Sequence, residues 1–317
     1  MLSYLLRRVL YAVPIALAVS VVCFLLVHLA PGDPINAIVS ADTPADVVEQ
    51  VRREYGLDRP LPTQFALWLG RVAQGDFGKS IASGRPVLDE LGPAIVNTLR
   101  LSLAAAAIGF ALGTALGVAA ALARGRWPDK SIVALAAASV SVPHYWLGMV
   151  LVIVFSVVFN LLPSMGAGGG GSEAWRWDWE HVQYLVLPAL TLSIIPMGIV
   201  ARTVRGVVLD VLGQDFITTL RGKGLRGGRI ALHVVKNAAP SVLSIMGLQL
   251  GYLMGGSILV ETVFSWPGTG FMLNGAIFQR DIPVLQGTIL VLALIFVLLN
   301  LLVDLMQTTL DPRIKRQ

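Results

Sequence analysis

Residues 214–240, QDFITTLRGKGLRGGRIALHVVKNAAP, decide how this chain is interpreted. They lie between two long apolar runs, carry five Lys and Arg residues, and contain four glycines within an otherwise helix-forming sequence. Glycine lets the chain reverse its direction at such a point. A cationic helical elbow between two apolar runs predicts a surface that another protein subunit holds.

The composition predicts an integral membrane protein. Hydrophobic residues make up 55% and charged residues 14% of the 317 residues, and the mean hydropathy is +0.73. Soluble domains are less apolar and more highly charged. The net charge of +5 would suit nucleic acid or an anionic surface, but the placement of the cations favours membrane topology. We therefore expect one membrane domain over residues 1–317. It should lie in a lipid bilayer and should bind no nucleic acid.

Six apolar stretches come close to the roughly 20 residues that a helix needs to cross a bilayer. They lie at residues 9–30, 101–123, 132–162, 185–201, 240–260 and 284–303. The third stretch is long enough to tilt or to kink at Pro143, and the fourth is the weakest because it is short and carries Pro188 and Pro196. We predict an all-α polytopic membrane protein with six transmembrane helices.

The orientation follows from the Lys and Arg residues of the short loops, which concentrate on the cytoplasmic side. If both termini are cytoplasmic, 15 of the 24 Lys and Arg residues lie inside, and most of the other nine lie in one long outer loop. The inside residues are Arg7, Arg8, Arg124, Arg126, Lys130, Arg202, Arg205, Arg221, Lys223, Arg226, Arg229, Lys236, Arg313, Lys315 and Arg316. We therefore predict that both termini are cytoplasmic.

Two outer loops have recognisable features. Residues 31–99 are long enough for a small helical extracytoplasmic lobe, with one helix starting at Thr43-Pro44-Ala45-Asp46 and ending at Gly56, and a second after Leu61-Pro62-Thr63. The second outer loop joins the glycines at 168–171 to tryptophans at 175, 177 and 179. Tryptophans are enriched at membrane interfaces, so we predict an interfacial anchor. The alternative is an aromatic contact surface for an external partner.

No catalytic, metal or nucleotide site is evident in the sequence. Gly78-Lys79-Ser80 is similar to the end of a phosphate-binding loop, but Ala73 stands where that motif needs its first glycine, and no apolar strand precedes it. The four histidines and the single cysteine, Cys23, lack metal-ligand spacing, and no GxSxG motif occurs. We expect this chain to be no enzyme and to hold no cofactor.

Ionisable residues inside apolar stretches are candidates for a substrate pathway. His144 follows Pro143 and either lines such a pathway or is a neutral histidine bonded to a backbone carbonyl near the kink. Glu261 and Asp304 lie near the ends of the fifth and sixth stretches, where snorkelling or pairing at a helix end would explain them. His144 and Glu261 are the two pathway candidates.

The elbow has a helical pattern of its own. Four apolar residues are spaced by three and four, so we expect them to share one face of an amphipathic surface helix. They are Leu209, Leu212, Phe216 and Leu220. The glycines expected to break this helix before residues 229–237 return to the membrane are Gly222, Gly224, Gly227 and Gly228. An ordinary positively charged inner loop would explain the arginines but not the two helices and the break between them.

The elbow resembles the cytoplasmic EAA loop of permease subunits of bacterial ABC importers, which has an acidic-aromatic start, a glycine and a downstream proline. The matching residues are Asp215-Phe216-Ile217-Thr218-Thr219, Lys223-Gly224-Leu225, His233, Asn237 and Pro240. Other stretches are similar to the first, B-type permease of the dipeptide/oligopeptide/nickel family, and together they cover nearly the whole chain. They are His28-Leu29-Ala30-Pro31-Gly32-Asp33-Pro34, Leu57-Asp58-Arg59-Pro60-Leu61-Pro62, Gly75-Asp76-Phe77-Gly78-Lys79-Ser80, Glu261-Thr262-Val263-Phe264-Ser265-Trp266-Pro267-Gly268, Arg280-Asp281-Ile282-Pro283 and Leu310-Asp311-Pro312-Arg313.

This resemblance implies an inner-membrane subunit that forms half of a translocation pathway. The implied partners are a second homologous permease, two ATPase subunits that bind ATP and Mg, and an extracytoplasmic substrate-binding protein. Residues 209–238 would couple this chain to the ATPases. The implied coupling residues are Asp215, Phe216, Thr219, Leu220, Arg221, Lys223, Gly224, Leu225, His233, Asn237 and Pro240. Leu220 and Gly222 depart from the small alanines usual at these positions.

The resemblance leaves the substrate open. It favours dipeptides or oligopeptides, and the alternative is nickel or glutathione, because these importers share permease motifs. A secondary transporter or channel that works alone is a hypothesis of another class, for which internal repeats and charged residues at the midplane are expected. A membrane assembly or anchoring protein is a further hypothesis, against which the family-like outer loops argue.

Overall fold

The structure is a computed structural model that describes residues 2–29, 35, 39, 43–54, 58–170 and 175–310. Within these ranges every regular element is a helix, as predicted. The chain forms two compact units. The first unit is Leu99–Trp266 with Leu299–Gln317, and the second is Leu2–Thr98 with Pro267–Leu298.

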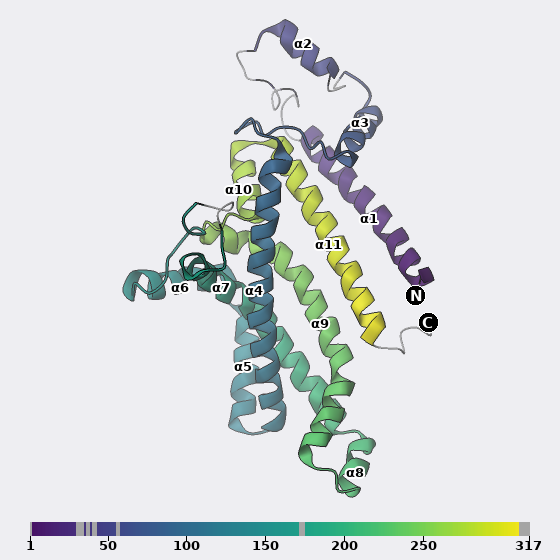
Figure 1. The fold of residues 1–317 in the computed structure, drawn as a ribbon, viewed down its shortest axis with the longest axis vertical. Coiled ribbons are helices and arrows are strands. Elements are labelled where there is room, and N and C mark those ends of the chain that lie inside the picture. The colour runs from purple at the N-terminus through teal and green to yellow at the C-terminus, as the bar shows by residue number, and fades with distance from the viewer. Residues whose placement is uncertain are drawn as a thin grey trace. The chain divides into compact units, whose positions relative to one another are not determined.

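The helices follow one another along the chain as Figure 1 shows. They are α1 (Leu2–Leu29), α2 (Ala45–Glu54), α3 (Leu61–Ala73), α4 (Val87–Leu122), α5 (Trp127–Ser141), α6 (His144–Leu151), the π-helix η2 (Val152–Val158), α7 (Trp179–Leu212), α8 (Asp215–Gly222), α9 (Gly227–Val263), α10 (Thr269–Gln279) and α11 (Ile282–Leu310). The predicted fourth stretch is thus part of a 34-residue helix, α7, that runs through Pro188 and Pro196. Neighbouring helices make such prolines tolerable.

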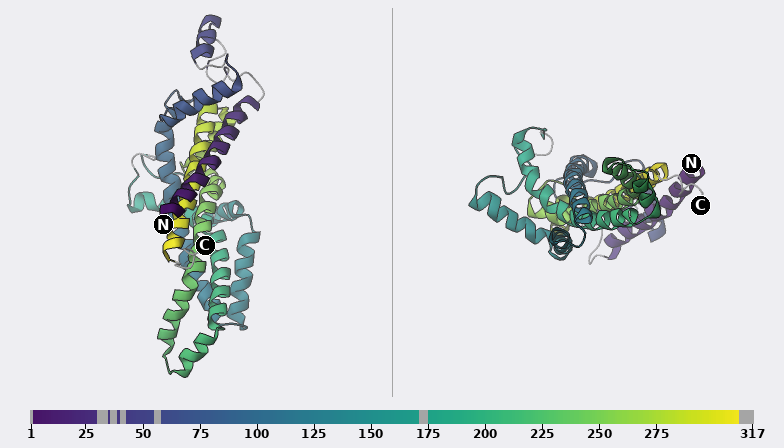
Figure 2. Two further views of the ribbon diagram at one scale, coloured as in Figure 1. Left: turned by 90° about the vertical axis from the view of Figure 1, so that its right-hand side faces the viewer. Right: turned by 90° about the horizontal axis from the view of Figure 1, so that it is seen from below.

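The first unit is packed around α7. In the most apolar part of α7, 61% of the residues are buried, against 33% in the corresponding parts of α4 and α9. α9 packs along α7, and Figures 1 and 2 show the two helices running together toward α8. The stretch that looked weakest in the sequence therefore belongs to the most buried helix of this unit. The helices packed around α7 stabilise it despite its two prolines.

A stripe of glycines brings α4 unusually close to α7. Gly109, Gly113 and Gly117 recur every four residues, so they lie on one side of α4. A Cβ atom added to each glycine in turn would lie 2.9, 2.7 and 2.5 Å from a backbone oxygen of α7. Those oxygens belong to Ser193, Met197 and Ala201. Small residues are what allow two helix backbones to approach so closely in a membrane.

A neighbouring face of α7 packs against α5. A Cβ atom added at Gly198 would meet the Ser139 side chain and would lie 2.8 Å from the Ala136 carbonyl oxygen. Two turns further along α7, Arg205 pairs with Asp129 at the start of α5. α7 is therefore held between α4 and α5 by close backbone contacts and by one ion pair.

The third predicted stretch is not one straight helix. α5 ends at Ser141, α6 begins at His144, and the two helices are bent by 100° at this break. Pro143 supplies no N–H, and the residue before a proline is disfavoured in helical geometry. Val142 accordingly has an extended backbone, with φ −86° and ψ 129°. The predicted kink at Pro143 is confirmed, and it is sharp enough to make this pair a broken span or a re-entrant loop.

The described residues contain fewer full-length spans than the six that were predicted. α4, α7, α9 and the described part of α11 are long and apolar enough to cross a membrane, and the bent α5–α6 pair adds a fifth span if it counts as one. The part of α1 that qualifies as apolar, Val13–Leu25, is shorter. The predicted first stretch ends at Ala30, which lies outside the described residues, as do Arg313, Lys315 and Arg316.

The second unit contains the two predicted short helices, α2 and α3. α2 ends at Glu54, and the predicted stop at Gly56 lies outside the described residues. Asp281, only 2% exposed, joins two sequence motifs that are far apart in the chain. Its carboxylate accepts hydrogen bonds from the Ser80 hydroxyl at 2.5 Å and from the Ala82 N–H at 3.2 Å. Ser80 therefore has a structural partner, which agrees with the rejection of Gly78-Lys79-Ser80 as a phosphate-binding loop.

The contact between α4 and α7 predicts the effect of a single methyl group. Gly113→Ala should lower the free energy of unfolding by about 1–3 kcal/mol, because its Cβ would overlap the Met197 carbonyl oxygen. Gly206→Ala on α7 is the matched control, since nothing lies within 4 Å of its added Cβ. Thermal unfolding of the purified protein in detergent measures both. A Gly113→Ala midpoint equal to that of the wild type would contradict the close contact.

Candidate functional site

The predicted elbow is the helix α8, which connects the end of α7 to the start of α9 (Figures 1 and 2). The prediction that one amphipathic helix carries all four spaced apolar residues is wrong. α7 ends at Leu212, and Gln214 has an extended backbone with φ −78° and ψ 147°. Leu209 and Leu212 therefore belong to α7, whereas Phe216 and Leu220 belong to α8.

Gly224 ends α8 with a left-handed turn. It has φ +75°, its N–H donates to the Arg221 carbonyl at 2.9 Å, and the Leu225 N–H donates to the Leu220 carbonyl at 3.1 Å. These two bonds form a Schellman motif, which satisfies carbonyl groups at the end of the helix. An added Cβ at Gly224 would meet nothing within 4 Å, so the backbone conformation, and not a lack of space, favours glycine here.

The other three glycines of the elbow do not separate two helices as predicted. Gly222 is the last residue of α8, and Gly227 and Gly228 form the first turn of α9. A Cβ added to any of them would meet nothing within 4 Å. The small alanine that the family usually has at position 222 would therefore fit as well as the glycine does.

Ile217 anchors α8, and the sequence interpretation missed it. Its side chain is 0% exposed and packs in one apolar cluster with Val208, Val211 and Val234 of α7 and α9. Phe216 and other partly buried residues pack against the same cluster. The break at Gly213 and Gln214 resets the helical phase, so a pattern continued from α7 does not point to Ile217.

The remaining face of the elbow is open and charged. Asp215 lies in the first turn of α8 and Arg221 in the last, an arrangement that the helix dipole favours. The exposed residues among those predicted to couple are Asp215, Thr219, Arg221, Lys223, Gly224, His233 and Asn237. The partly buried ones are Phe216, Leu220, Leu225 and Pro240. The structure thus gathers residues 215–225 into one helix and turn, and places the other three along α9.

Two of the exposed polar residues are engaged with their own helices. The Thr219 hydroxyl donates to the Asp215 carbonyl at 3.1 Å, and the Asn237 amide donates to the His233 carbonyl at 2.8 Å. Pro240 lies inside α9, which continues through it without a break. The charged side chains of Asp215, Arg221 and Lys223 are exposed and open to an external partner.

The two pathway candidates lie away from the elbow. His144 is the first residue of α6, and its Nε2 atom is buried without a hydrogen-bond partner among the described residues. Glu261, near the end of α9, is 0% exposed, so snorkelling toward the membrane surface does not explain it. The side chain of Asp304 lies outside the part of the chain whose side chains are described.

The tryptophans of the second outer loop do not act as one group. Trp175 is 7% exposed, and the guanidinium carbon of Arg100 lies 4.4 Å from its ring centroid, a cation–π contact. Its inclusion in an interfacial anchor was therefore wrong. Trp177 and Trp179 are 74% and 66% exposed, so the anchor and the partner surface both stay open for them. Gly171 of the preceding glycine run lies outside the described residues.

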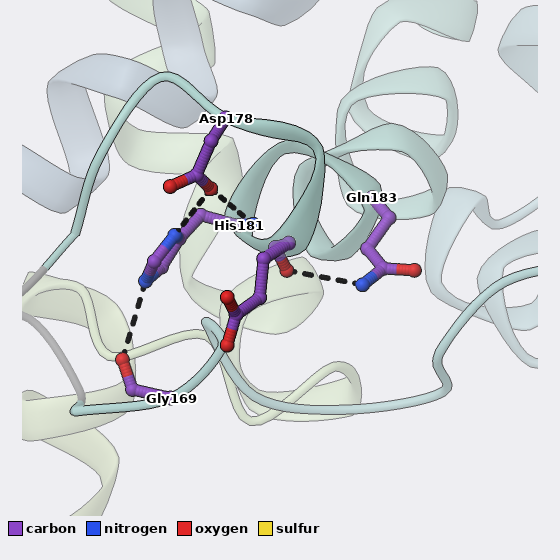
Figure 3. A network of polar contacts seen from close by, with 5 residues as sticks. Gly169, Asp178, His181 and Gln183 are labelled. Atoms are coloured by element: carbon purple, nitrogen blue, oxygen red, sulfur yellow. Dashed lines mark hydrogen bonds and ion pairs between the residues drawn. The ribbon is translucent and has the colours of Figure 1, made fainter.

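A histidine closes this loop onto the start of α7, as Figure 3 shows. His181 Nδ1 lies 2.6 Å from Asp178 Oδ1, and Nε2 lies 3.2 Å from the Gly169 carbonyl oxygen. Because both partners are oxygen acceptors, both ring nitrogens must donate, which favours the protonated ring. Asp178 also caps α7 by accepting from the His181 N–H at 3.0 Å. The hydrogen bond from His181 lowers the pKa of the Asp178 carboxyl.

No metal site accompanies these clusters. Across the described ranges, no group of three or more His, Cys, Asp or Glu side chains is placed to hold a metal ion. Cys23 is buried and unpaired. The features that combine exposure with a defined, anchored shape are those of the elbow, which suit binding to a protein surface rather than bond-making chemistry.

Two family models match most of the chain. Residues 113–316 match the family described as binding-protein-dependent transport system inner membrane component. Residues 1–98 match the family described as the N-terminal part of a membrane component of binding-protein-dependent transport systems.

Individual relatives and a solved structure agree with these families. The chain is 41% identical over 316 residues to the glutathione transport system permease protein GsiC of Salmonella paratyphi A, which covers 99% of each chain. It is 40% identical to the corresponding Escherichia coli K12 protein, with the same coverage. The MetNI methionine ABC transporter in inward-facing conformations aligns with a TM-score of 0.56 and 19% identity, covering 70% of this chain and 96% of that chain. This last likeness shows the fold alone.

The burial of Ile217 predicts how α8 is held. Ile217→Ala should cost about 2–5 kcal/mol of local stability, because it leaves a cavity in the cluster that joins α8 to α7 and α9. Thr218→Ala, at the exposed neighbouring position, is the control. Hydrogen exchange of the amides between residues 214 and 225 measures the difference. Equal exchange in the two variants would show that Ile217 does not anchor the helix.

The lowered pKa of Asp178 predicts a pH dependence of stability. The stabilisation is present above the ordinary Asp pKa of about 4 and is lost as the pH falls through the lowered value. Asp178→Asn keeps a good helix cap but removes the charge that pairs with His181. Its thermal midpoint should lie below that of the wild type at pH 6, and the gap should narrow progressively as the pH falls below about 4. A gap of the same size at both pH values would contradict the ion pair.

Proposed function

The chain belongs to the inner membrane components of binding-protein-dependent transport systems, and from this premise we propose a role for each of its parts. Like its relatives, it is a permease subunit of an ABC importer in the bacterial inner membrane, and it is not an enzyme. Such subunits work with a partner permease, ATPase subunits and a substrate-binding protein. What remains to be assigned is the cargo, the coupling site and the topology.

The proposed cargo is glutathione. The observation that carries this proposal is the 40–41% identity to glutathione permeases, which extends over 99% of each chain. The sequence interpretation favoured dipeptides or oligopeptides and gave glutathione as an alternative, and the similarity supports the alternative better. Glutathione is itself a small peptide, so both interpretations require a pathway for a charged peptide backbone. We assign His144 and Glu261 to this pathway.

The proposed coupling site is the elbow between residues 209 and 238. α8 has a buried anchor, Ile217, and an exposed face with Asp215, Arg221 and Lys223. A short helix of this kind fits a groove on an ATPase subunit, and closure of the ATPases would then displace it as a rigid body. The other proposed coupling residues are Phe216, Thr219, Leu220, Gly224, Leu225, His233, Asn237 and Pro240.

The proposed topology places this elbow on the cytoplasmic side. We propose six crossings with both termini inside, one transmembrane domain over residues 1–317, and an extracytoplasmic lobe over residues 31–99. The excess of Lys and Arg in the elbow supports the cytoplasmic placement. ATP and Mg would bind the partner ATPases, and this chain would hold no cofactor.

Reconstituted transport tests the cargo. The chain is assembled in proteoliposomes with its partner permease, both ATPase subunits and the cognate binding protein, and uptake of labelled glutathione, a dipeptide and a nickel chelate is compared. We expect ATP-dependent uptake of glutathione. ATP-dependent uptake of the dipeptide or the nickel chelate without glutathione would refute the proposed cargo. Uptake by the chain alone under an ion gradient would favour a secondary transporter instead.

The left-handed turn at Gly224 predicts a graded effect on coupling. Gly224→Val should lower uptake per ATP hydrolysed by about tenfold or more, because a β-branched residue strains this conformation. Gly224→Asn should retain most of the coupling, since asparagine tolerates positive φ. Paired measurements of uptake and ATP hydrolysis check both variants. Full coupling in Gly224→Val would argue against a role for this turn.

A further inference from the structure

A partly buried ion pair joins α5 to α7 a short distance from the elbow. Arg205 Nε donates to Asp129 Oδ1 at 2.5 Å, and Arg205 Nη2 donates to Asp129 Oδ2 at 2.8 Å. Asp129 is only 3% exposed. Two parallel bonds between a planar guanidinium and a carboxylate fix the orientation of both groups as well as their distance.

The same carboxylate also holds the turn between α4 and α5. Asp129 Oδ2 accepts from the Gly125 N–H at 2.8 Å, and Gly125 has φ +78° within that turn. Asp129 lies in the first turn of α5, where the helix dipole stabilises a negative charge. One side chain therefore ties together the end of α4, the start of α5 and the last part of α7.

This pair and a second close contact both attach α5 to α7. The other is the close approach at Gly198, which faces Ala136 and Ser139. Arg205 follows Gly198 by two turns, about 10 Å along the helix axis. Two separate attachments prevent α5 from pivoting on α7, so the helices should move as one body.

The placement of the pair gives it a mechanical consequence. α7 continues past Arg205 to Leu212 and then, after the break, to α8. At its other end, α5 leads into the 100° bend and α6. Gly148 of α6 packs against Thr191 and Phe264, since an added Cβ there would lie 3.1 and 3.0 Å from their side chains. A displacement applied to α8 is thus carried by α7 toward the bent α5–α6 segment, and the pair holds α5 to α7 as it moves.

We propose that Asp129 and Arg205 are positioning residues that transmit the displacement of α8 to α5 and α6 during transport. This inference rests on the proposed coupling role of the elbow. Neither residue contacts cargo or nucleotide in this account. The pair keeps α5 and α7 rigid, so that work done on the elbow moves the bent segment instead of being absorbed by sliding between the two helices.

Arg205→Lys tests the transmission, because it keeps the charge and removes the bidentate bond. In the reconstituted complex, uptake per ATP hydrolysed should fall about tenfold while the complex still assembles and hydrolyses ATP. Asp129→Asn should act in the same direction. Arg202→Lys, at an exposed position on the same helix, is the matched control and should leave the ratio unchanged. A merely structural role would lower uptake and ATP hydrolysis together, in proportion to the amount of assembled complex.

A distance measurement separates this inference from the proposed cargo. Spin labels at Leu135→Cys on α5 and Asp210→Cys on α7 occupy exposed positions, and the background carries Cys23→Ala. The label distance should stay the same with and without ATP in the wild-type background and should become ATP-dependent in Arg205→Lys. An ATP-dependent distance in the wild-type background, or an unchanged uptake ratio in Arg205→Lys, would overturn the proposal. If the wild-type complex does not take up glutathione, the proposed cargo is wrong. The label distances then still test whether the Asp129–Arg205 pair keeps α5 and α7 rigid.

Discussion

The close approach of α4 to α7 is the constraint on which the rest of the first unit depends. Glycines at positions 109, 113 and 117 leave the backbone oxygens of α7 within reach of α4, and a larger residue at any of them would push the helices apart. In a bilayer, no hydrophobic force drives helices together, so close packing of this kind is a principal source of association. α7 is thereby held rigidly, and it fixes the positions of the helices packed against it and of the elbow.

The position of the elbow depends on α7. α7 ends at Leu212, α8 turns away, and Ile217 returns to the apolar cluster formed by α7 and α9. The Schellman turn at Gly224 then directs the chain into α9. Because both ends of α8 are connected to packed helices and its centre is anchored, a force on its exposed face is transferred to the helices. A mobile loop with the same charges would bend instead.

Local sequence features predicted only part of the elbow. The acidic start at Asp215, the turn at Gly224 and the return into α9 depend on residues close together in the chain. Ile217 was missed because the break at Gly213 and Gln214 resets the helical phase, and Gly213 was not interpreted as the end of the preceding helix. The kink was predicted from the presence of Pro143, but its angle of 100° was not.

Contacts between distant residues were beyond the sequence. The four-residue spacing of Gly109, Gly113 and Gly117 is visible, but nothing in one chain identifies the helix that they face. Asp129 and Arg205 are 76 residues apart; Arg205 was counted only among the topology charges, and Asp129 was not singled out. Trp175 looked like its two neighbours, and its burial against Arg100 depends on the fold.

Cross-linking from α8 tests the central claim most directly. A photoreactive amino acid in place of Thr219, which is exposed on α8, is introduced into the complex in intact cells. The account predicts a cross-link to an ATPase subunit. Cross-links to the external binding protein, or to no protein while transport proceeds normally, would contradict the claim that this helix is the point at which the ATPases act on the membrane domain.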